Sequence, residues 1–430
     1  MGLCPQSCTF VVPPTGSNMG KDNTKHLTGQ PIFKQIIQNV PKPLFDKIVT
    51  ESRSDRYCKS FSSWDEFVTM MFGILTRCDS AREVCDGMAA LGGKLNHLGM
   101  DCAPAKSTLG DALRDRTCDI FEKFYYALLT YYSSVLSDSR KDGVNFKQFY
   151  AFDSTTIRLF TDVLKGVGRN PKGDGKKKGG LKVHMLTDVH ADVAVYARIS
   201  EAKQHDKKFL KYLNLPQGSM IVFDKAYNHY WQFAKWTEEE INFVCRLKDN
   251  AVYEVQEVLL KNTLPDKQSG VLKEEHIHLK YAENKNGKKT KTLCLRKVTY
   301  RDEKGRVYKF ITNNWSITNE EVALLYKYRW TIETSFKRLK QNFQLHYFYS
   351  ESENGIKTQV WCTLIAYLLL TVFKRLSKSN KAFSTIAALI RIHLISHLDL
   401  FWVIENGRRT YVKRTRKRNK VPEVVQLLLF

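Results

Sequence analysis

Apolar residues recur at spacings of three, four and seven positions along the first third of the chain, which is the period of a helix with one buried face. This pattern starts near Ile32 and continues to residue 140, with the pair Gly92-Gly93 as a break between helices. The residues before it are rich in Gly, Pro, Ser, Thr and Asn. We therefore expect a disordered segment over 1–30 and a small helical domain over 31–140, which is either a DNA-binding domain or a plain helical bundle.

The pattern changes after residue 145, where short apolar runs alternate with helical stretches. Such alternation predicts a mixed α/β core, which we assign to residues 145–246 and 307–400. The strands expected in this core are 149–152, 181–186, 193–199, 220–223 and 308–312. Its expected helices are 206–213, 228–239, 319–346 and 356–377.

Residues 247–306 alternate apolar and polar positions, as in His276-Ile277-His278-Leu279. The pair Asn286-Gly287 is typical of a two-residue hairpin turn. This segment is therefore predicted to be an antiparallel β insertion within the core. A basic C-terminal segment is assigned to 401–430.

The chain is strongly basic, with 68 Lys and Arg against 44 Asp and Glu and a net charge of +24. Nucleic acid is the favoured polyanionic partner, and a basic surface for membranes is the alternative. Two runs concentrate this charge and are candidate DNA contacts that could equally be solvated. They are Lys176, Lys177 and Lys178 in a Gly-Lys tract, and Arg408, Arg409, Lys413, Arg414, Arg416, Lys417, Arg418 and Lys420 near the C-terminus.

The ten cysteines contain no CxxC pair and no histidine at zinc-finger spacing, so we expect reduced thiols, no structural zinc and a cytoplasmic location. The longest apolar stretch, 360–373, is about 14 residues and too short to span a bilayer. It is predicted to be a buried helix, with no membrane partner.

Two aspartates follow apolar strands: Asp153 comes after 149–152 and Asp224 after 220–223. Either carboxylate alone agrees with a capping role at the next turn. A third acidic residue, Glu333, lies in the helix expected over 319–346. Counted from Tyr326, the residues Arg329, Glu333 and Lys340 follow at offsets of 3, 7 and 14 positions. At 100° per residue these four share a stripe about 60° wide, which is either a functional face or a solvated face with an Arg329–Glu333 ion pair.

The pattern Tyr326-x2-Arg329-x3-Glu333-x6-Lys340 resembles the Y-x2-R-x3-E-x6-K signature of the IS-four family of insertion-sequence transposases. The contexts FDSTTI at Asp153 and VFDKAY at Asp224 are similar to that family too. One departure is Lys225-Ala226, which stands where many relatives have Arg-Gly. The resemblance covers roughly residues 30–400.

The resemblance implies a DDE transposase with an RNase H-like core, in which Asp153, Asp224 and Glu333 are catalytic and hold two Mg²⁺ ions, with Mn²⁺ tolerated. It implies double-stranded DNA partners, namely terminal inverted repeats and target DNA, a homodimer, and cut-and-paste transposition through a hairpin. Tyr326, Arg329 and Lys340, with Lys337 beside them, would bind DNA phosphates. The location would be the bacterial cytoplasm, associated with the nucleoid. The rivals are a metal-dependent nuclease with the same core and a non-catalytic DNA-binding regulator.

Two further features stay open at this stage. Asp188, His190 and Asp192 form a D-x-H-x-D cluster, which is either a metal site or a polar turn between strands. An aromatic side chain is expected to receive a displaced base at the hairpin. None is singled out, because the predicted insertion contains no Trp, and Trp231, Trp236 and Trp315 only flank it.

Overall fold

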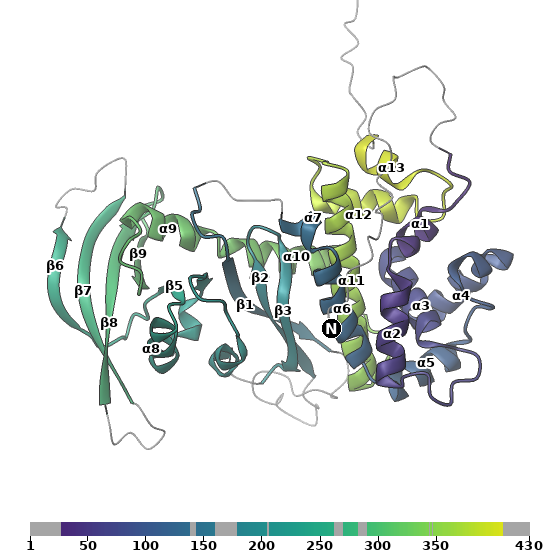
Figure 1. Ribbon diagram of the computed structural model, residues 1–430, viewed down its shortest axis with the longest axis horizontal. Coiled ribbons are helices and arrows are strands. Elements are labelled where there is room, and N and C mark those ends of the chain that lie inside the picture. The colour runs from purple at the N-terminus through teal and green to yellow at the C-terminus, as the bar shows by residue number, and fades with distance from the viewer. Residues whose placement is uncertain are drawn as a thin grey trace, which may run out of the picture.

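The computed structural model describes residues 27–137, 143–159, 179–203, 206–261, 270–282, 290–343, 345 and 347–406 (Figure 1). Several sequence-based expectations fall outside these residues. They are the predicted disorder over most of 1–30, the hairpin turn at Asn286-Gly287, the tract of Lys176, Lys177 and Lys178, and the C-terminal basic run from Arg408 to Lys420.

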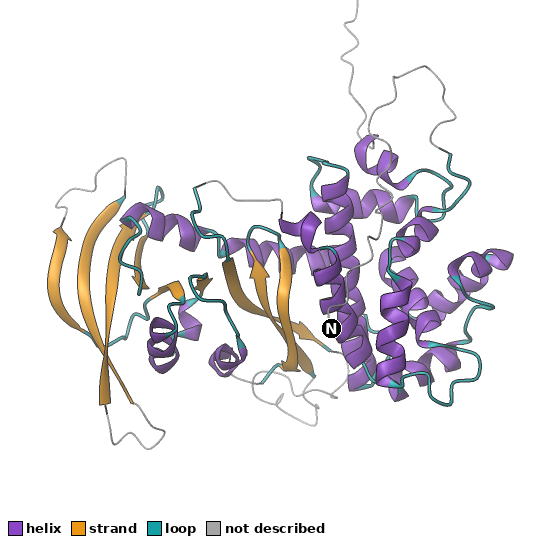
Figure 2. Ribbon diagram, in the orientation of Figure 1, coloured by secondary structure: helices purple, strands orange, loops and turns teal. Residues whose placement is uncertain are grey.

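Helices make up the N-terminal part of the chain from Ile32 to Ser137 (Figure 2). They are α1 (Ile32–Gln38), α2 (Lys42–Ser52), α3 (Ser63–Thr76), α4 (Ala81–Ala89), the 3₁₀ helix η1 (Gly92–Leu98), α5 (Lys106–Asp115), α6 (Asp119–Tyr131) and α7 (Ser133–Ser137). Helix α3 starts at a capping box, in which Ser62 and Asp65 each bind the other's backbone N–H. The apolar faces meet around Phe45, whose ring lies 4.9 Å from that of Phe124. Helical periodicity therefore buries one shared face, as the spacing predicts.

The nine strands form one sheet, in the order β3-β2-β1-β4-β5-β9-β8-β7-β6. The strands are β1 (Phe149–Arg158), β2 (Gly180–Asp188), β3 (Val193–Glu201), β4 (Met220–Phe223), β5 (Asn242–Arg246), β6 (Glu254–Lys261), β7 (Val271–Ala282), β8 (Thr290–Arg301) and β9 (Val307–Thr312). β1 pairs antiparallel with β2 and parallel with β4, and β4 pairs parallel with β5. The sheet is therefore mixed, as the α/β pattern predicts.

The β insertion extends this same sheet. Strand β9 pairs with β5 on one side and with β8 on the other, and β7 and β6 follow outward. The joining strand β5 was missing from the sequence-based prediction. The strand comprises Asn242–Arg246, whose apolar run over 243–245 is shorter than that of β4, and pairing with β4 and β9 defines it as a strand.

Further helices complete the core. They are η2 (Asp206–Tyr212), η3 (Lys225–Tyr227), α8 (Tyr230–Glu238), α9 (Asn319–Lys327), α10 (Trp330–Asn342), α11 (Glu353–Leu376), α12 (Phe383–Ile392) and α13 (Leu400–Asn406). The single helix predicted over 319–346 is wrong, because two helices, α9 and α10, meet at a tight turn. There the amide of Arg329 bonds to the carbonyl of Tyr326, and that of Thr331 to the carbonyl of Tyr328, which are i to i−3 bonds of the 3₁₀ type.

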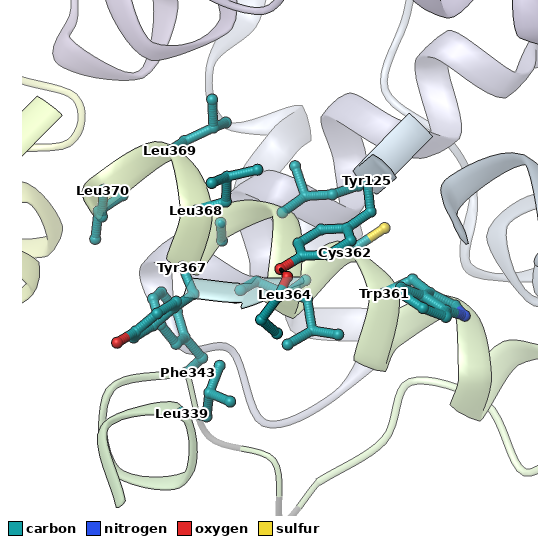
Figure 3. Packing of buried hydrophobic residues seen from close by; sticks show 14 of the residues in the cluster. Tyr125, Leu339, Phe343, Trp361, Cys362, Leu364, Tyr367, Leu368, Leu369 and Leu370 are labelled. Carbon is teal, nitrogen blue, oxygen red and sulfur yellow. Dashed lines mark hydrogen bonds between the residues drawn. The ribbon is translucent and has the colours of Figure 1, made fainter. Parts of the chain in front are cut away.

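Helix α11 runs through the centre of the molecule. It has 24 residues, which is longer than its apolar stretch indicates, and by length and composition it could cross a membrane. Within the protein, 94% of its most apolar window is buried. Figure 3 shows Trp361, Cys362 and Leu364 packed beside Tyr125 of α6. This burial confirms the prediction of a core helix.

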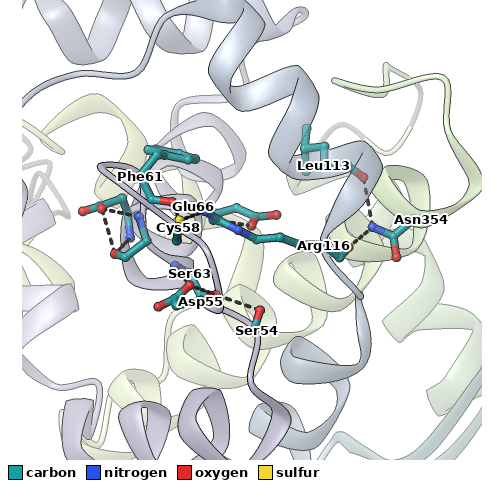
Figure 4. A network of polar contacts seen from close by, with 11 residues as sticks. Ser54, Asp55, Cys58, Phe61, Ser63, Glu66, Leu113, Arg116 and Asn354 are labelled. Atoms are coloured by element: carbon teal, nitrogen blue, oxygen red, sulfur yellow. Dashed lines mark hydrogen bonds and ion pairs between the residues drawn. The ribbon is translucent and has the colours of Figure 1, made fainter.

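Polar contacts fix the N-terminal helices to α11 (Figure 4). The Asn354 side chain at the start of α11 accepts from the backbone amide of Cys118 at 2.9 Å and donates to the carbonyls of Leu113 and Arg116. Arg116 in turn pairs with buried Glu66 of α3 at 3.1 Å. The helical region and the catalytic core thus share one hydrophobic core, in which α11 is packed on both sides.

Candidate active site

The two aspartates come together because β1 and β4 are parallel neighbours. The last paired residues of the two strands are Phe152 and Phe223, and each is followed directly by an aspartate. Asp153 was expected at a strand end, but β1 continues to Arg158 because β2 pairs with it along its whole length. Asp224 does follow the end of β4, as predicted.

The Asp153 side chain is partly buried, with 20% of its surface exposed. Its Oδ1 accepts from the backbone amide of Ser154 at 2.8 Å and from the Tyr227 hydroxyl at 3.3 Å. Burial raises the pKa of Asp153 to about 6, against the lowering effects of the Ser154 hydrogen bond and of Arg329. The charges of Asp224 and Glu333 raise the same pKa further, which places the three carboxylates in one electrostatic environment.

Arg329 links two of these carboxylates. Its Nη1 lies 2.6 Å from Oε1 of Glu333 and 3.5 Å from Oδ2 of Asp153. The guanidinium is buried, and its Nε has no hydrogen-bond partner among the described residues. Arg329 is therefore buried while 36% of the Glu333 side chain is exposed, so the alternative of a solvated helix face does not apply to Arg329.

Asp224 has a capping role and also faces the site. Its Oδ2 accepts a long hydrogen bond, 3.5 Å, from the amide of Ala226 at the start of η3, and its Oδ1 accepts from the Tyr326 hydroxyl at 3.4 Å. Burial raises the pKa of Tyr326 well above its ordinary value, so this phenol stays neutral and can donate. Tyr326 thereby links α9 to the end of β4.

Lys340 lies on α10, and its side chain reaches β1 beyond Asp153. Its Nζ donates to the carbonyl oxygen of Thr156 at 3.0 Å, and burial lowers its pKa. Lys337 lies exposed on the outer side of α10. Tyr326 and Arg329 therefore contact Asp224 and Asp153 respectively, and Arg329 pairs with Glu333, whereas Lys340 reaches β1 three residues beyond Asp153. The turn between α9 and α10 makes the stripe of these four residues irregular.

The D-x-H-x-D cluster is a turn. Oδ1 of Asp188 accepts from the amides of His190 and Ala191, at 2.8 and 2.9 Å. Asp192 instead contacts Arg338 and the hydroxyl of Ser335 on α10. The structure thus favours the polar turn, because the two aspartates of the cluster bind different partners.

One aromatic residue of the site escaped the sequence-based reasoning. Trp330 is 58% exposed at the start of α10, and its ring centre lies 5.1 Å from the Arg329 guanidinium carbon. The sequence shows a tryptophan between the signature residues Arg329 and Glu333, but only the structure shows that it is exposed. Of the flanking tryptophans, Trp236 is buried, whereas Trp231 and Trp315 are 43% and 48% exposed.

The site can be tested for its fit to a divalent cation. In the described part of the chain, no three His, Cys, Asp or Glu side chains are gathered closely enough to hold a metal ion as they stand. The donor chemistry nevertheless fits, since three carboxylates offer the hard oxygen ligands that Mg²⁺ prefers. Arg329 lies between two of them, so a bound cation would share their charge with this guanidinium.

Comparison with known proteins identifies the core and leaves the N-terminal helices without an assigned role. Residues 145–369, which contain all three carboxylates, match the transposase DDE domain family. Residues 28–101 match a domain of unknown function, DUF4372.

Individual relatives agree with this result. A protein described as a transposase, y4zB of Sinorhizobium fredii, is 26% identical over 69% of this chain and 79% of its own length. The probable transposase for insertion sequence element IS5377 of Geobacillus stearothermophilus is 24% identical over 60% of this chain and 65% of its own length. The transposase for IS231D of Bacillus thuringiensis is 22% identical over 79% of each chain. These matches confirm the resemblance and the RNase H-like fold class, and the chain is a DDE transposase of the IS-four family.

Proposed function

We propose that this transposase excises an insertion sequence by cutting its ends through a hairpin and then joins the freed ends to target DNA. We further propose that Asp153, Asp224 and Glu333 are its catalytic residues. The observation that carries this assignment is that Arg329 contacts both Asp153 and Glu333, while the charges of Asp224 and Glu333 raise the pKa of Asp153.

In this proposal the three carboxylates hold two Mg²⁺ ions. When bound, such ions make the attacking oxygen a better nucleophile and stabilise negative charge on the leaving oxygen. Water attacks phosphorus at the transposon end and breaks the bond to the 3′ oxygen, which leaves as a hydroxyl. That hydroxyl attacks the opposite strand to form the hairpin, and after the hairpin is opened by water it attacks the target. Each displacement forms one phosphorus–oxygen bond and breaks another.

The surrounding residues position these groups. Tyr326 holds Asp224 through its hydroxyl. Arg329 carries a guanidinium with one unpartnered nitrogen, and guanidinium donors suit phosphate oxygens. Lys340 and Lys337 lie further along the same helix and are proposed to bind the DNA backbone near the cleaved end. Trp330, exposed beside Arg329, is the aromatic that we propose stacks on the displaced base.

The DNA partners and the homodimer are proposed because membership of this family implies them. The partners are terminal inverted repeats and target DNA, held by a homodimer at the bacterial nucleoid. The N-terminal helices, Lys176 to Lys178 and the basic run from Arg408 to Lys420 are proposed as further DNA contacts. Removing 408–420 should weaken binding and reduce its salt dependence, and an unchanged salt dependence would argue against contact by this run.

Substitution of the carboxylates tests the proposed site. Asp153→Asn, Asp224→Asn and Glu333→Gln should each lower Mg²⁺-dependent cleavage of a labelled end by at least about a thousandfold, because each removes a charged ligand. End binding should persist. Asp46→Asn, which alters an exposed ion pair on α2, is the matched control and should cleave normally.

Pre-cut ends separate transposition from simple hydrolysis. A transposase joins a pre-cut 3′ end to target DNA, whereas a nuclease with the same core leaves it unjoined. Wild-type cleavage by any of the three carboxylate variants would refute the site, and absence of joining by the native protein would refute strand transfer.

A further inference from the structure

The loop between α2 and α3 exposes two arginines and a tyrosine. Arg53 follows the last residue of α2, and Arg56 and Tyr57 come three and four residues later. All three residues are exposed, and Tyr57 is 85% exposed. Within the described part of the chain, neither arginine forms an ion pair. We call residues 53–57 the arginine loop.

A tight turn keeps these side chains close together. The amide of Arg56 bonds to the carbonyl of Arg53 at 3.2 Å, which closes a turn whose end Cα atoms lie within about 7 Å of each other. The Arg56 guanidinium carbon lies 4.9 Å from the ring centre of Tyr57. Arg53 and Arg56 also line the same open groove, about 540 Å³ in volume, beside α2.

The two carboxylates that line this groove are already engaged. Asp46 pairs with Lys42 at 2.7 Å. Oδ1 of Asp55 accepts from the backbone amide of Ser63 at 2.7 Å and from the Ser63 hydroxyl at 2.6 Å (Figure 4). Neither carboxylate therefore occupies the guanidinium donors of the arginine loop, which are left for a ligand.

Polar contacts order the loop in advance. The Ser54 hydroxyl lies 2.9 Å from that of Ser63 at the start of α3. Further along, Arg116 donates to the Cys58 thiol and to the carbonyl of Phe61 (Figure 4). A ligand would therefore meet a loop that loses little conformational entropy on binding.

The backbone indicates that the side chains of this loop serve more than folding. Arg53 and Tyr57 have φ values of 50° and 68°, in the left-handed region that glycine adopts freely and tyrosine rarely. Tyr57 also leaves most of a large ring in water. Because glycine would suit the backbone better at both positions, these side chains point to a partner outside the chain.

We propose that Arg53, Arg56 and Tyr57 bind the sugar–phosphate backbone of double-stranded DNA. The inference rests on the proposed DNA-cutting function and gives the N-terminal helices a defined contact. Guanidinium groups bind phosphate oxygens through paired donors, and a tyrosine hydroxyl donates to phosphate as well. In Figure 1, α2 and α3 lie across α11 from the strands that carry Asp153 and Asp224. The arginine loop therefore holds DNA away from the cleaved bond.

Binding of the full chain to a fluorescein-labelled duplex, followed by anisotropy over a salt series with Ca²⁺ as the only divalent cation, tests the arginines. Arg53→Gln and Arg56→Gln should each weaken binding about fivefold near 0.15 M salt and reduce the salt slope by about 0.9, because each removes one phosphate contact. The loss should be equal on two duplexes of unrelated sequence, since backbone contacts carry no sequence information. Arg82→Gln removes the same charge from an exposed arginine on α4 and should keep the native slope.

Tyr57 is tested by measurements that move in opposite directions. Tyr57→Gly should unfold at an equal or higher temperature, because glycine relieves the left-handed backbone, yet it should bind DNA about two- to fivefold more weakly. Its salt slope should stay native, since no charge is lost. A merely structural tyrosine would instead give a lower unfolding temperature together with weaker binding, and that result would refute the contact.

Native salt slopes for both Arg53→Gln and Arg56→Gln, or an equal reduction in Arg82→Gln, would overturn the proposal, and a loop that serves a protein partner predicts that result. Failure here is distinguishable from failure of the proposed function. The loop variants should still cleave at the native rate when protein saturates the DNA, whereas loss of the catalytic assignment would appear in the carboxylate variants and leave the binding differences unchanged.

Discussion

Asp153, a proposed catalytic residue, lies where its charge is unfavourable for the fold. Burial disfavours its charge, and two like charges add to that effect, while one hydrogen bond and one guanidinium oppose it. The balance raises its pKa above the usual range for aspartate. A carboxylate with this property costs stability when it ionises, and a bound cation would offset that cost.

This balance predicts how stability depends on pH. Because the folded pKa is raised from 3.8 to about 6, Asp153 imposes almost no penalty below pH 3.8; the penalty grows as the pH rises from 3.8 to about 6 and is constant above that. Asp153→Asn should therefore be more stable than the native protein at pH 7.5 without divalent metal, by on the order of 1–3 kcal/mol. Thermal unfolding in EDTA measures this difference, which should vanish near pH 4. An equal difference at both pH values would contradict the assignment.

Trp330 carries a prediction about one step of the reaction. If its ring stacks on a displaced base, Trp330→Ala should slow hairpin formation by roughly ten- to a hundredfold, from the loss of about 1–3 kcal/mol of stacking. The first nick should be nearly unaffected. Gel analysis of nicked and hairpin products gives both rates, and Trp231→Ala, which changes another exposed tryptophan, is the control. Equal slowing of both steps would point to a structural role.

At the scale of elements, α9 is fixed where the insertion meets the core. Thr318 and Glu321 form a capping box at its start. Next to them, the Asn319 side chain accepts from Arg296 at 2.8 Å and donates to Glu274 at 2.7 Å, while Arg296 pairs with Glu274 at 2.6 Å. These contacts tie α9 to β7 and β8, and α9 carries Tyr326 to Asp224.

Removing the link should affect both stability and rate. Asn319→Ala leaves two buried charged groups short of a partner and should lower the free energy of unfolding by about 1–3 kcal/mol. It should also reduce end cleavage under conditions where the protein is fully folded, because Tyr326 loses its support. Denaturant titration and single-turnover cleavage measure the two effects. Asn406→Ala, at an exposed asparagine whose side chain donates to the Trp402 carbonyl of its own helix, should change neither.

The elements also show what could be predicted from sequence. Strong periodicity located the N-terminal helices, and compact apolar runs located β4 with its observed bounds and β1, β2 and β3 with their bounds shortened. The strand β5 and the break at Arg329 depend on partners distant in the chain, so local pattern could not show them. The same holds for the site: motifs singled out Asp153, Asp224 and Glu333, whereas the contact of Arg329 with Asp153 and the exposure of Trp330 arise only when β1, β4 and α10 are assembled.

At the scale of the whole molecule, the hydrophobic core around α11 joins the N-terminal helices to the sheet. The apolar surface of α11 packs against α3, α5 and α6 of the N-terminal region as well as against β3 and α12. The boundary placed near residue 140 from the sequence therefore marks a change from helices to mixed sheet and helix, and the two regions share one hydrophobic core.

Truncation tests that conclusion. A chain starting at residue 143 would expose the face of α11 that α3, α5 and α6 cover, and it should aggregate or associate with membranes. Sedimentation after expression measures the soluble fraction, which should fall at least about tenfold. Co-expression of residues 1–142 as a separate chain should restore it. A soluble, cleavage-competent fragment without these helices would show that the core is not shared.

The same packing sets an order of events during synthesis. Helix α3 leaves the ribosome early, but the helix that covers its apolar face is made only after the whole sheet. The apolar face of the nascent N-terminal helices therefore stays exposed until α11 is synthesised, and chaperones bind such exposed apolar surface. Glu333 and α11 follow the whole sheet in the chain, so a chain terminated before them lacks one of the three proposed catalytic carboxylates as well as the helix that covers α3.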